Sequence, residues 1–172
     1  MKPVIRDARE EDLPTLVNFL ASLALHVSGA PPQELKASER ERLTQSLQRA
    51  MASPDRKILV AEATGGVLAG MGDISVWSSQ GIWEQAQDVV YRSAVIDDVW
   101  VEPDFRGLGL FKDILRVLVD FAAQRGAQEL VLEYSASNKE AKTAWTKLGF
   151  KTTGVRAAAF TQNIQEALAG PR

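Results

Sequence analysis

Apolar residues recur three and four positions apart along several stretches of the chain, a spacing that predicts amphipathic helices. The stretches cover residues 13–26, 38–51 and 109–125, and a further helix is expected over 138–148. Pro14 fits the first turn of the first helix. Ser38 and Glu41 have the spacing of a capping box, which places the start of the second helix near residue 38.

Short apolar runs between these helices predict extended segments. We expect strands over residues 4–6, 57–63, 67–70, 94–101, 128–134 and 151–160. The turn at 64–66 joins the second and third strands into a hairpin, whose second strand we expect Gly70 and Gly72 to interrupt. Residues 78–92 are polar with interspersed aromatic side chains, which indicates a loop.

The order of these elements predicts a three-layer α/β fold, a mixed sheet with helices on both faces. Strand 94–101, helix 109–125 and strand 128–134 form a crossover unit, so these two strands should lie parallel and adjacent. The chain has 172 residues, about the length of one ordinary domain. We expect a single domain over 1–165 and a C-terminal tail over 166–172.

Composition narrows the chemistry that the chain can carry. There is no cysteine, so a disulfide scaffold, a cysteine nucleophile and a thiolate zinc site are excluded. The single histidine, His26, is expected at the surface or as a helix C-cap, and we expect no metal site. The basic residues between 36 and 57 alternate with acidic ones and indicate a solvated helix face.

Net charge and hydropathy indicate where the protein acts. The formal net charge of −2 predicts no general attraction to nucleic acid. No apolar run approaches the ~18 residues of a membrane span. We therefore expect neither a membrane span nor a signal peptide, and a cytoplasmic location.

A glycine-rich loop, Arg106-Gly107-Leu108-Gly109, stands between a predicted strand and a predicted helix. At a helix N-terminus such a loop presents unpaired backbone N–H groups to an anion, and the alternative is a turn without a ligand. The loop lacks the lysine-serine ending of a P-loop and the third glycine of a dinucleotide fingerprint. Nucleoside triphosphates and nicotinamide cofactors are therefore disfavoured.

The residues around this loop, Val99 to Leu110, resemble the acyl-CoA pyrophosphate loop of the GNAT superfamily of N-acetyltransferases. The pattern of that loop is Q/R-x-x-G-x-G/A. Arg106 and Gly109 match its first and middle positions, and Phe111 stands where Gly or Ala is usual.

Three further segments are similar to the same family and follow its order along the chain. Asn138 and Ala141 with Lys147-Leu148-Gly149-Phe150 resemble the second CoA element, Leu59 to Glu62 with Gly66 and Gly70 the hairpin, and Ile5 to Ala8 with Asp12 and Leu13 the start. Agreement of four segments in order supports the resemblance more strongly than any one of them.

The resemblance implies acetyl-CoA as co-substrate and a GNAT-like, mostly antiparallel sheet in which the parallel strand pair splays apart. Backbone N–H groups at 107–112 would receive the pyrophosphate, and Arg106 either steers the phosphates or braces the loop. The pantetheine would pair with the strand before the loop, where a backbone N–H of Val99 or Trp100 would stabilise the oxyanion. The implied CoA-binding residues are Val99, Trp100, Val101, Arg106, Gly107, Leu108, Gly109, Leu110, Phe111, Lys112, Asn138, Ala141 and Trp145.

A carboxylate near the cleft is needed, because a primary amine with a pKa of about 10.4 is almost fully protonated at neutral pH. Asp97 and Asp98 lie on one predicted strand, whose successive side chains point to opposite faces, so only one can face the acceptor directly. The family's I-E-D pattern, similar to Ile96-Asp97-Asp98, favours Asp97 as general base, with Asp98 next and Glu62 and Glu133 as weaker candidates. The alternative is that these acids pair with basic side chains and solvent takes the proton.

The departing CoA thiolate is the second group that needs a proton. The family often uses a tyrosine seven residues after the asparagine, and here that position is Trp145, whose indole N–H is not a useful acid. Tyr134 or water supplies the proton, or the thiolate leaves unaided. Trp145 is expected to pack against the pantetheine or the core.

The resemblance thus implies an enzyme that moves an acetyl group from acetyl-CoA to a primary amine of a small molecule, by direct attack in a ternary complex. Two alternatives stay open, an N-acetyltransferase of proteins or peptides and a binding module that senses acyl-CoA. A homodimer is common in the family. We expect the acceptor at 26–38 and 78–92, and Trp77, Trp83, Tyr91 and Trp100 are candidates to wall a covered pocket.

Overall fold

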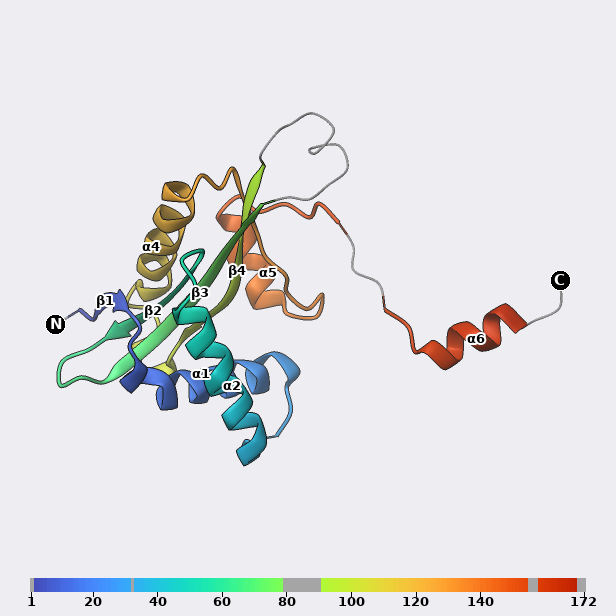
Figure 1. Ribbon diagram of the computed structural model, residues 1–172, viewed down its shortest axis with the longest axis horizontal. Helices are drawn as coiled ribbons and strands as arrows, with labels where there is room; N and C mark the ends of the chain where they lie inside the picture. The colour runs from blue at the N-terminus through green and yellow to red at the C-terminus, as the bar shows by residue number, and fades with distance from the viewer. Residues whose placement is uncertain (1, 32, 79–90, 155–157, 170–172) are drawn as a thin grey trace. The chain divides into compact units, whose positions relative to one another are not determined.

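A five-stranded sheet forms the centre of the computed structural model, which describes residues 2–31, 33–78, 91–154 and 158–169 (Figure 1). Across the sheet the strands are β1 (Val4–Asp7), β2 (Arg56–Glu62), β3 (Leu68–Ser78), β4 (Arg92–Val101) and β5 (Glu129–Val131). Neighbours from β1 to β4 pair antiparallel, and β4 pairs with β5 in parallel. The predicted mixed sheet with one parallel pair is confirmed.

Helices cover both faces of the sheet in the first of two compact units, Met1–Glu133. They are α1 (Leu13–Ser28), α2 (Ala37–Met51) and α4 (Leu110–Gln124), with the 3-10 turns η1 (Glu10–Asp12) and η2 (Pro103–Phe105). Figure 1 shows α1 and α2 on one side of the sheet and α4 on the other. The predicted three layers are therefore confirmed.

The second unit, Tyr134–Arg172, contains α5 (Lys139–Lys147) and α6 (Thr161–Ala169). Taken over the described ranges of the whole chain, no helix has both the length and the apolar character that a membrane crossing requires. The predicted single domain over 1–165 stays a prediction.

Successive residues of β3 face the two helical layers in turn, on opposite sides of the sheet. Met71 is fully buried in a cluster with Leu16 and Val17 of α1 and Leu47 of α2. Gly72 points the other way, because successive side chains of a strand alternate between its faces. We call the first side of the sheet the α1/α2 face and the second the α4 face.

Two glycines of β3 serve close packing, which corrects the prediction that they interrupt the strand. A Cβ on Gly72 would lie 2.4 Å from Cγ2 of Ile114 and 3.0 Å from Cδ1 of Leu118, so the glycine lets α4 approach the sheet. A Cβ on Gly70 would lie 2.6 Å from the carbonyl oxygen of Trp100. The strand runs unbroken through both positions to Ser78.

Two other predictions about local structure are wrong. The second helix begins at Ala37 with Lys36 as N-cap, so Ser38 lies inside the first turn, where it cannot act as the cap of a capping box. The strand expected over 151–160 is absent from 151–154 and 158–160, which have no pairing partner among the described residues. The loop expected over 78–92 lies for the most part outside the described residues.

Candidate active site

The parallel strands β4 and β5 pair over a short stretch, at the end of which β5 itself ends. Their register joins Ser93 to Glu129, Ala94 to Leu130 and Val95 to Val131. Beyond these pairs β4 continues to Val101, while no described strand lies along its β5 side. Unpaired N–H and C=O groups along a strand edge can bind an extended ligand by its amides. The predicted parallel pair is confirmed, although β5 is shorter than the strand predicted over 128–134, and the splay of the two strands stays a prediction.

A β-bulge at Asp97 lies at the start of the stretch of β4 beyond these pairs. Asp98 pairs with Asp73 and Ile96 with Ile74, so Asp97 is an extra residue on β4 without a partner on β3. Paired residues of adjacent strands share a face, so Asp98 lies with Asp73 on the α1/α2 face.

The bulge also brings Asp97 to the same face. Val95, two residues earlier on β4, pairs with Ser75, which lies two residues after Asp73 on β3. The hydroxyl of Ser75 donates to Oδ2 of Asp97 at 3.0 Å, which agrees with this placement. The prediction that only one of Asp97 and Asp98 can face the acceptor is therefore wrong, because it assumed a regular strand.

One arginine contacts two of the three acids Asp73, Asp97 and Asp98, which we call the carboxylate cluster. Arg56 donates two hydrogen bonds to Asp73, from Nε to Oδ1 at 3.0 Å and from Nη2 to Oδ2 at 2.6 Å. The same Nη2 lies 3.7 Å from Oδ2 of Asp97. Among the described residues Asp98 has no ion pair and no side-chain hydrogen bond. Asp98 is therefore the one carboxylate of this cluster that is not paired with a cation.

The titration of Asp98 reflects this arrangement. Burial, reinforced by the negative charges of Asp73 and Asp97 and opposed by Arg56, raises the pKa of Asp98 to about 6. Burial also raises the pKa of Asp73, against the hydrogen bonds from Arg56. A carboxylate with a pKa near 6 is ionised at neutral pH, yet it is a stronger base than an ordinary aspartate. It is suited to take a proton from an amine.

Asp73 and Arg56 were not predicted as parts of the site. Asp73 is only 2% exposed, and it is the single charged residue of the segment 69–76, which is apolar apart from Asp73 and Ser75. A buried charge requires a partner, so this isolated acid was a readable signal. Arg56 begins β2 and is half-buried, so its assignment to a solvated helix face is wrong.

The glycine-rich loop forms the start of α4 as predicted. Gly107 and Gly109 have left-handed φ angles of 79° and 80°, and Gly109 is the N-cap of the helix. The first N–H groups of a helix have no carbonyl within the helix to bind, and they carry its positive end. Leu110 is fully buried and anchors the helix start, whereas Leu108 is 54% exposed. Ligand contacts at this loop are therefore expected from the backbone.

The aromatic and histidine candidates fall in different surroundings. Trp100 is only 7% exposed within the core of the α1/α2 face, so its side chain does not wall an open pocket. Trp77 is exposed and Tyr91 half-buried, while Trp83 lies outside the described residues. His26 is exposed in the last turn of α1, as predicted, and its ring centroid lies 5.8 Å from that of Trp100.

The predicted second CoA element has a local structural role within its own unit. Asn138 is the N-cap of α5, and its Oδ1 accepts the backbone N–H of Ala141 at 3.0 Å. The Asn-x-x-Ala spacing is thus that of a helix cap. Trp145 packs edge-on against Phe150, with ring centroids 5.4 Å apart, and Tyr134 is half-buried. The roles predicted for these residues toward CoA stay predictions.

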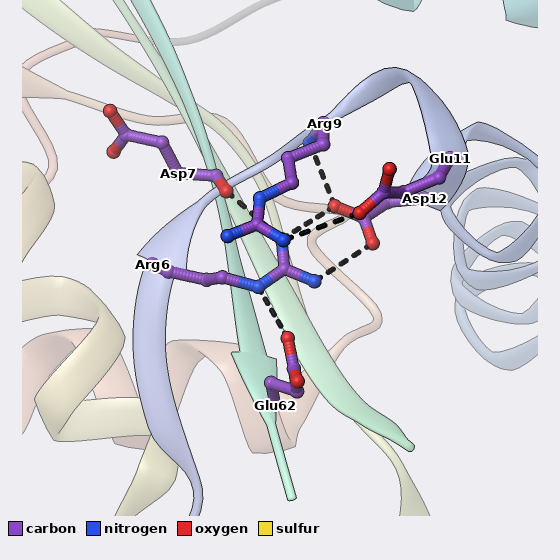
Figure 2. A network of polar contacts seen from close by, with 6 residues as sticks. All are labelled: Arg6, Asp7, Arg9, Glu11, Asp12 and Glu62. Atoms are coloured by element: carbon purple, nitrogen blue, oxygen red, sulfur yellow. Dashed lines mark hydrogen bonds and ion pairs between the residues drawn. The ribbon is translucent and has the colours of Figure 1, made fainter. Parts of the chain in front are cut away.

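Glu62, a weaker candidate for the base, belongs to an ion-pair network at the N-terminus (Figure 2). Arg6 donates from Nε to Glu62, and from Nη1 and Nη2 to the two carboxylate oxygens of Asp12 at 2.7 Å and 3.0 Å. The backbone N–H of Arg9 also donates to Asp12 at 2.7 Å. This network ties β1 to β2 and to the start of α1. Glu133, the other weaker candidate, is exposed.

The described residues include no group of three or more His, Asp or Glu side chains arranged to hold a metal ion. Asp73, which is bonded to Arg56, illustrates why the carboxylate cluster does not form one. Arg56 occupies both oxygens of the most buried carboxylate.

Comparison with known proteins agrees with this geometry. The family described as "Acetyltransferase (GNAT) family" matches residues 15–150. Streptothricin acetyltransferase of Streptomyces lavendulae is 31% identical over 112 residues, 65% of this chain and 53% of that protein. A ribosomal protein bS18-alanine N-acetyltransferase of Escherichia coli is 35% identical over 68 residues, 40% of this chain and 46% of that protein. The chain spans about half the length of these curated relatives.

A solved structure shows the same fold. It is a protein from Clostridium acetobutylicum, described as a predicted acetyltransferase with acetyl-CoA, and it superimposes with a TM-score of 0.75. The match covers 93% of this chain and 97% of that one at 20% sequence identity. At this identity the likeness concerns the fold.

Proposed function

Because the chain belongs to the acetyltransferase (GNAT) family, we propose that it transfers an acetyl group from acetyl-CoA to a primary amine of a small molecule. The observation that carries this proposal is the position of Asp98, an uncommitted carboxylate at the bulge of β4, beside the stretch of β4 that continues beyond its pairing with β5. A base and an unpaired strand edge are the two features that this reaction requires at one place.

The edge of β4 beyond its pairs with β5 and the loop that follows it are the proposed acetyl-CoA site. Backbone groups between Ile96 and Val101 on the β5 side have no described strand partner and can bind the amides of the pantetheine. The loop at Gly107 to Gly109 and the first turn of α4 offer N–H groups to the pyrophosphate. Strand and loop are continuous in the chain, so a single extended ligand can contact both.

Asp98 is the proposed general base. The family resemblance favours Asp97, but Asp97 already accepts a hydrogen bond from Ser75 and lies 3.7 Å from Arg56. The pKa of Asp98, about 6, is closer to the ~10.4 of an alkylamine than the ~3.9 of an ordinary aspartate. Proton transfer from the amine to Asp98 is therefore less unfavourable than transfer to an unperturbed carboxylate.

The proposed step is a direct transfer of the acetyl group from the sulfur of CoA to the nitrogen of the amine. The amine nitrogen bonds to the thioester carbon, the carbon–sulfur bond breaks, and the amine proton passes to Asp98. A backbone N–H of Val99 or Trp100 on this edge of β4 is the proposed donor to the developing oxyanion. Water is the proposed source of the proton for the thiolate, and no cysteine is present to form an acyl-enzyme.

Release of free thiol from acetyl-CoA tests the proposal. The acceptor panel contains small amines, amino acids, aminoglycosides and short peptides, each assayed with the wild type and with Asp98→Asn. Release that requires a small amine and is lost in Asp98→Asn is the expected result. Acetyl-CoA binding without turnover on any acceptor would contradict the proposal and favour an acyl-CoA sensor.

A protein N-terminus is the second candidate acceptor. The Escherichia coli relative, 35% identical over its matched segment, carries the name of a ribosomal-protein alanine acetyltransferase. Turnover confined to the peptides of the panel would select this candidate. A homodimer and a cytoplasmic location stay predictions.

A further inference from the structure

The loop that connects β4 to α4 has few internal supports. Two backbone bonds close η2, from the N–H of Phe105 to the carbonyl of Glu102 at 2.9 Å and from that of Arg106 to Pro103 at 3.2 Å. After them, Gly107 and Gly109 have space around them, since a Cβ on either would meet no atom within 4 Å. A loop with so little packing needs another contact to fix its conformation.

Arg106 makes that contact, and its side chain turns back toward β4. Its Nε donates to the carbonyl oxygen of Val101 at 3.1 Å. Its guanidinium lies over the indole ring of Trp100, 5.0 Å from the ring centroid, a stacked cation–π arrangement. Both contacts are with the end of the strand, so the side chain joins the loop to the sheet.

Trp100 is a fixed platform for this stack. Its ring is buried in the core of the α1/α2 face, beside Met71 and Ile58. Its Nε1 donates to Oε1 of Glu102 at 3.3 Å, and the ring of His26 meets it edge-on at an interplanar angle of 69°. Because these contacts hold Trp100 in place, its ring can fix the position of the Arg106 side chain that lies over it.

We infer that Arg106 is a positioning residue, which holds the pyrophosphate loop by stacking on Trp100 and bonding to Val101, and that it is not a phosphate ligand. The inference rests on the proposed function, since it assumes that the loop binds the pyrophosphate of acetyl-CoA. It decides between the two roles that the sequence leaves open for Arg106.

Two substitutions separate a brace from a phosphate ligand. Glutamine has its Nε2 at the same number of bonds from Cα as the Nε of arginine, so Arg106→Gln keeps a planar group and a donor to Val101 but loses the charge. Arg106→Lys keeps the charge but places a methylene at that position and has no planar group. A brace therefore loses one of its two contacts in each variant, the cation over Trp100 in Arg106→Gln and the donor to Val101 in Arg106→Lys, whereas a phosphate ligand tolerates lysine better than glutamine.

Titration calorimetry with acetyl-CoA measures the outcome for the wild type, Arg106→Gln, Arg106→Lys and Arg106→Ala. We expect Arg106→Gln and Arg106→Lys to bind equally well, each within about threefold of the wild type, and Arg106→Ala to bind about fivefold to tenfold more weakly, the scale of one lost hydrogen bond with its stack. Arg116→Gln, which removes an exposed arginine of α4, is the matched control for loss of charge, with an unchanged Kd expected. Binding near the wild type for Arg106→Lys together with binding like Arg106→Ala for Arg106→Gln would overturn the inference.

A second ligand shows whether the effect acts at the pyrophosphate. Acetyl-pantetheine lacks that group, so turnover of this substrate should differ by less than about twofold among all the variants, because a brace on the loop affects only what the loop binds. An equal loss with acetyl-pantetheine would overturn the inference in favour of a general role in the fold. Failure of the wild type to bind acetyl-CoA would overturn the proposed function together with the inference. Lysine near the wild type and glutamine like alanine, with normal wild-type binding, would overturn the inference alone.

Discussion

Two clusters in the first unit each place one arginine among several carboxylates, and they differ in how completely the charges are paired. In the N-terminal network, Arg6 bonds to both Asp12 and Glu62, and Asp12 also accepts a backbone N–H (Figure 2). The hydrogen bonds from Arg6 outweigh burial and lower the pKa of Asp12. This cluster therefore favours the ionised form of Asp12.

The carboxylate cluster on β3 and β4 has the same ingredients with the opposite result. Arg56 is engaged by Asp73 and lies near Asp97, which leaves Asp98 without a cation of its own. Burial then dominates, and the pKa of Asp98 rises to about 6. The comparison shows that pairing, and not the number of arginines and acids, decides whether a cluster stabilises the fold or retains a usable base.

Asp98→Asn should have the largest effect on activity. It removes the proposed base, so kcat/KM should fall by about 10²- to 10³-fold, the scale of general base catalysis. Stability at neutral pH should not decrease, because a carboxylate whose folded-state pKa is raised above its unfolded value is destabilising once ionised. Thiol release and thermal unfolding of the same preparation check both statements. Unchanged turnover would show that the uncommitted carboxylate has no part in catalysis.

Arg56→Gln should have the largest effect on stability. It leaves the buried Asp73 without its cation, which is expected to cost about 3 kcal/mol, as when one partner of a buried ion pair is removed. It also removes the charge that opposes the rise in the pKa of Asp98, so the acidic limb of activity should move to higher pH. Urea unfolding and a pH profile measure the two effects. Arg56→Lys is the matched variant, which should keep the limb near its wild-type position.

Arg6→Gln should lower stability without lowering activity. It removes two charge-assisted bonds to Asp12, which is 5% exposed, at an expected cost of about 2 kcal/mol. A lowered carboxyl pKa stabilises the fold above the unfolded value near 3.8 and ceases to do so as pH falls through the folded value. The difference between variant and wild type should therefore shrink below about pH 4. Arg9→Gln, whose side chain pairs with exposed Glu11, is the control; an equal loss there would contradict the assignment.

Asp97→Asn should have the smallest effect. Asp97 is exposed and accepts a hydrogen bond from Ser75. Its substitution should reduce kcat/KM by less than about tenfold, because it acts only by removing a negative charge near Asp98. That charge helps to raise the pKa of Asp98, so the acidic limb should move slightly to lower pH. Side-by-side profiles with Asp98→Asn measure the contrast. A larger loss for Asp97→Asn would reverse the roles of the two acids.

The predictable parts of the fold are those that depend on residues close together in the sequence. The stripe of helix α4, the glycines at 107 and 109 and the strand before them determine a strand-loop-helix geometry within about 30 residues, and this geometry is confirmed. The parallel pair follows from the crossover rule.

What was not predictable depends on register between strands. The bulge at Asp97 changes which face two acids share, and alternation along one strand carries no sign of it. Asp73 and Arg56 are 17 residues apart and meet only through the β2–β3 pairing, so neither is a recognisable motif alone. Asn138 presents the opposite difficulty, because a recognisable motif has two readings. Its spacing with Ala141 fits both a helix cap and a ligand motif.

The pH dependence of kcat/KM, compared between the wild type, Asp98→Asn and Asp97→Asn, tests the central claim most directly. Asp98 must be ionised to act, so wild-type activity should rise through an apparent pKa of about 6. That limb should disappear in Asp98→Asn and persist in Asp97→Asn. A limb near pH 6 that survives in Asp98→Asn would contradict the account, because it would place the titrating base elsewhere.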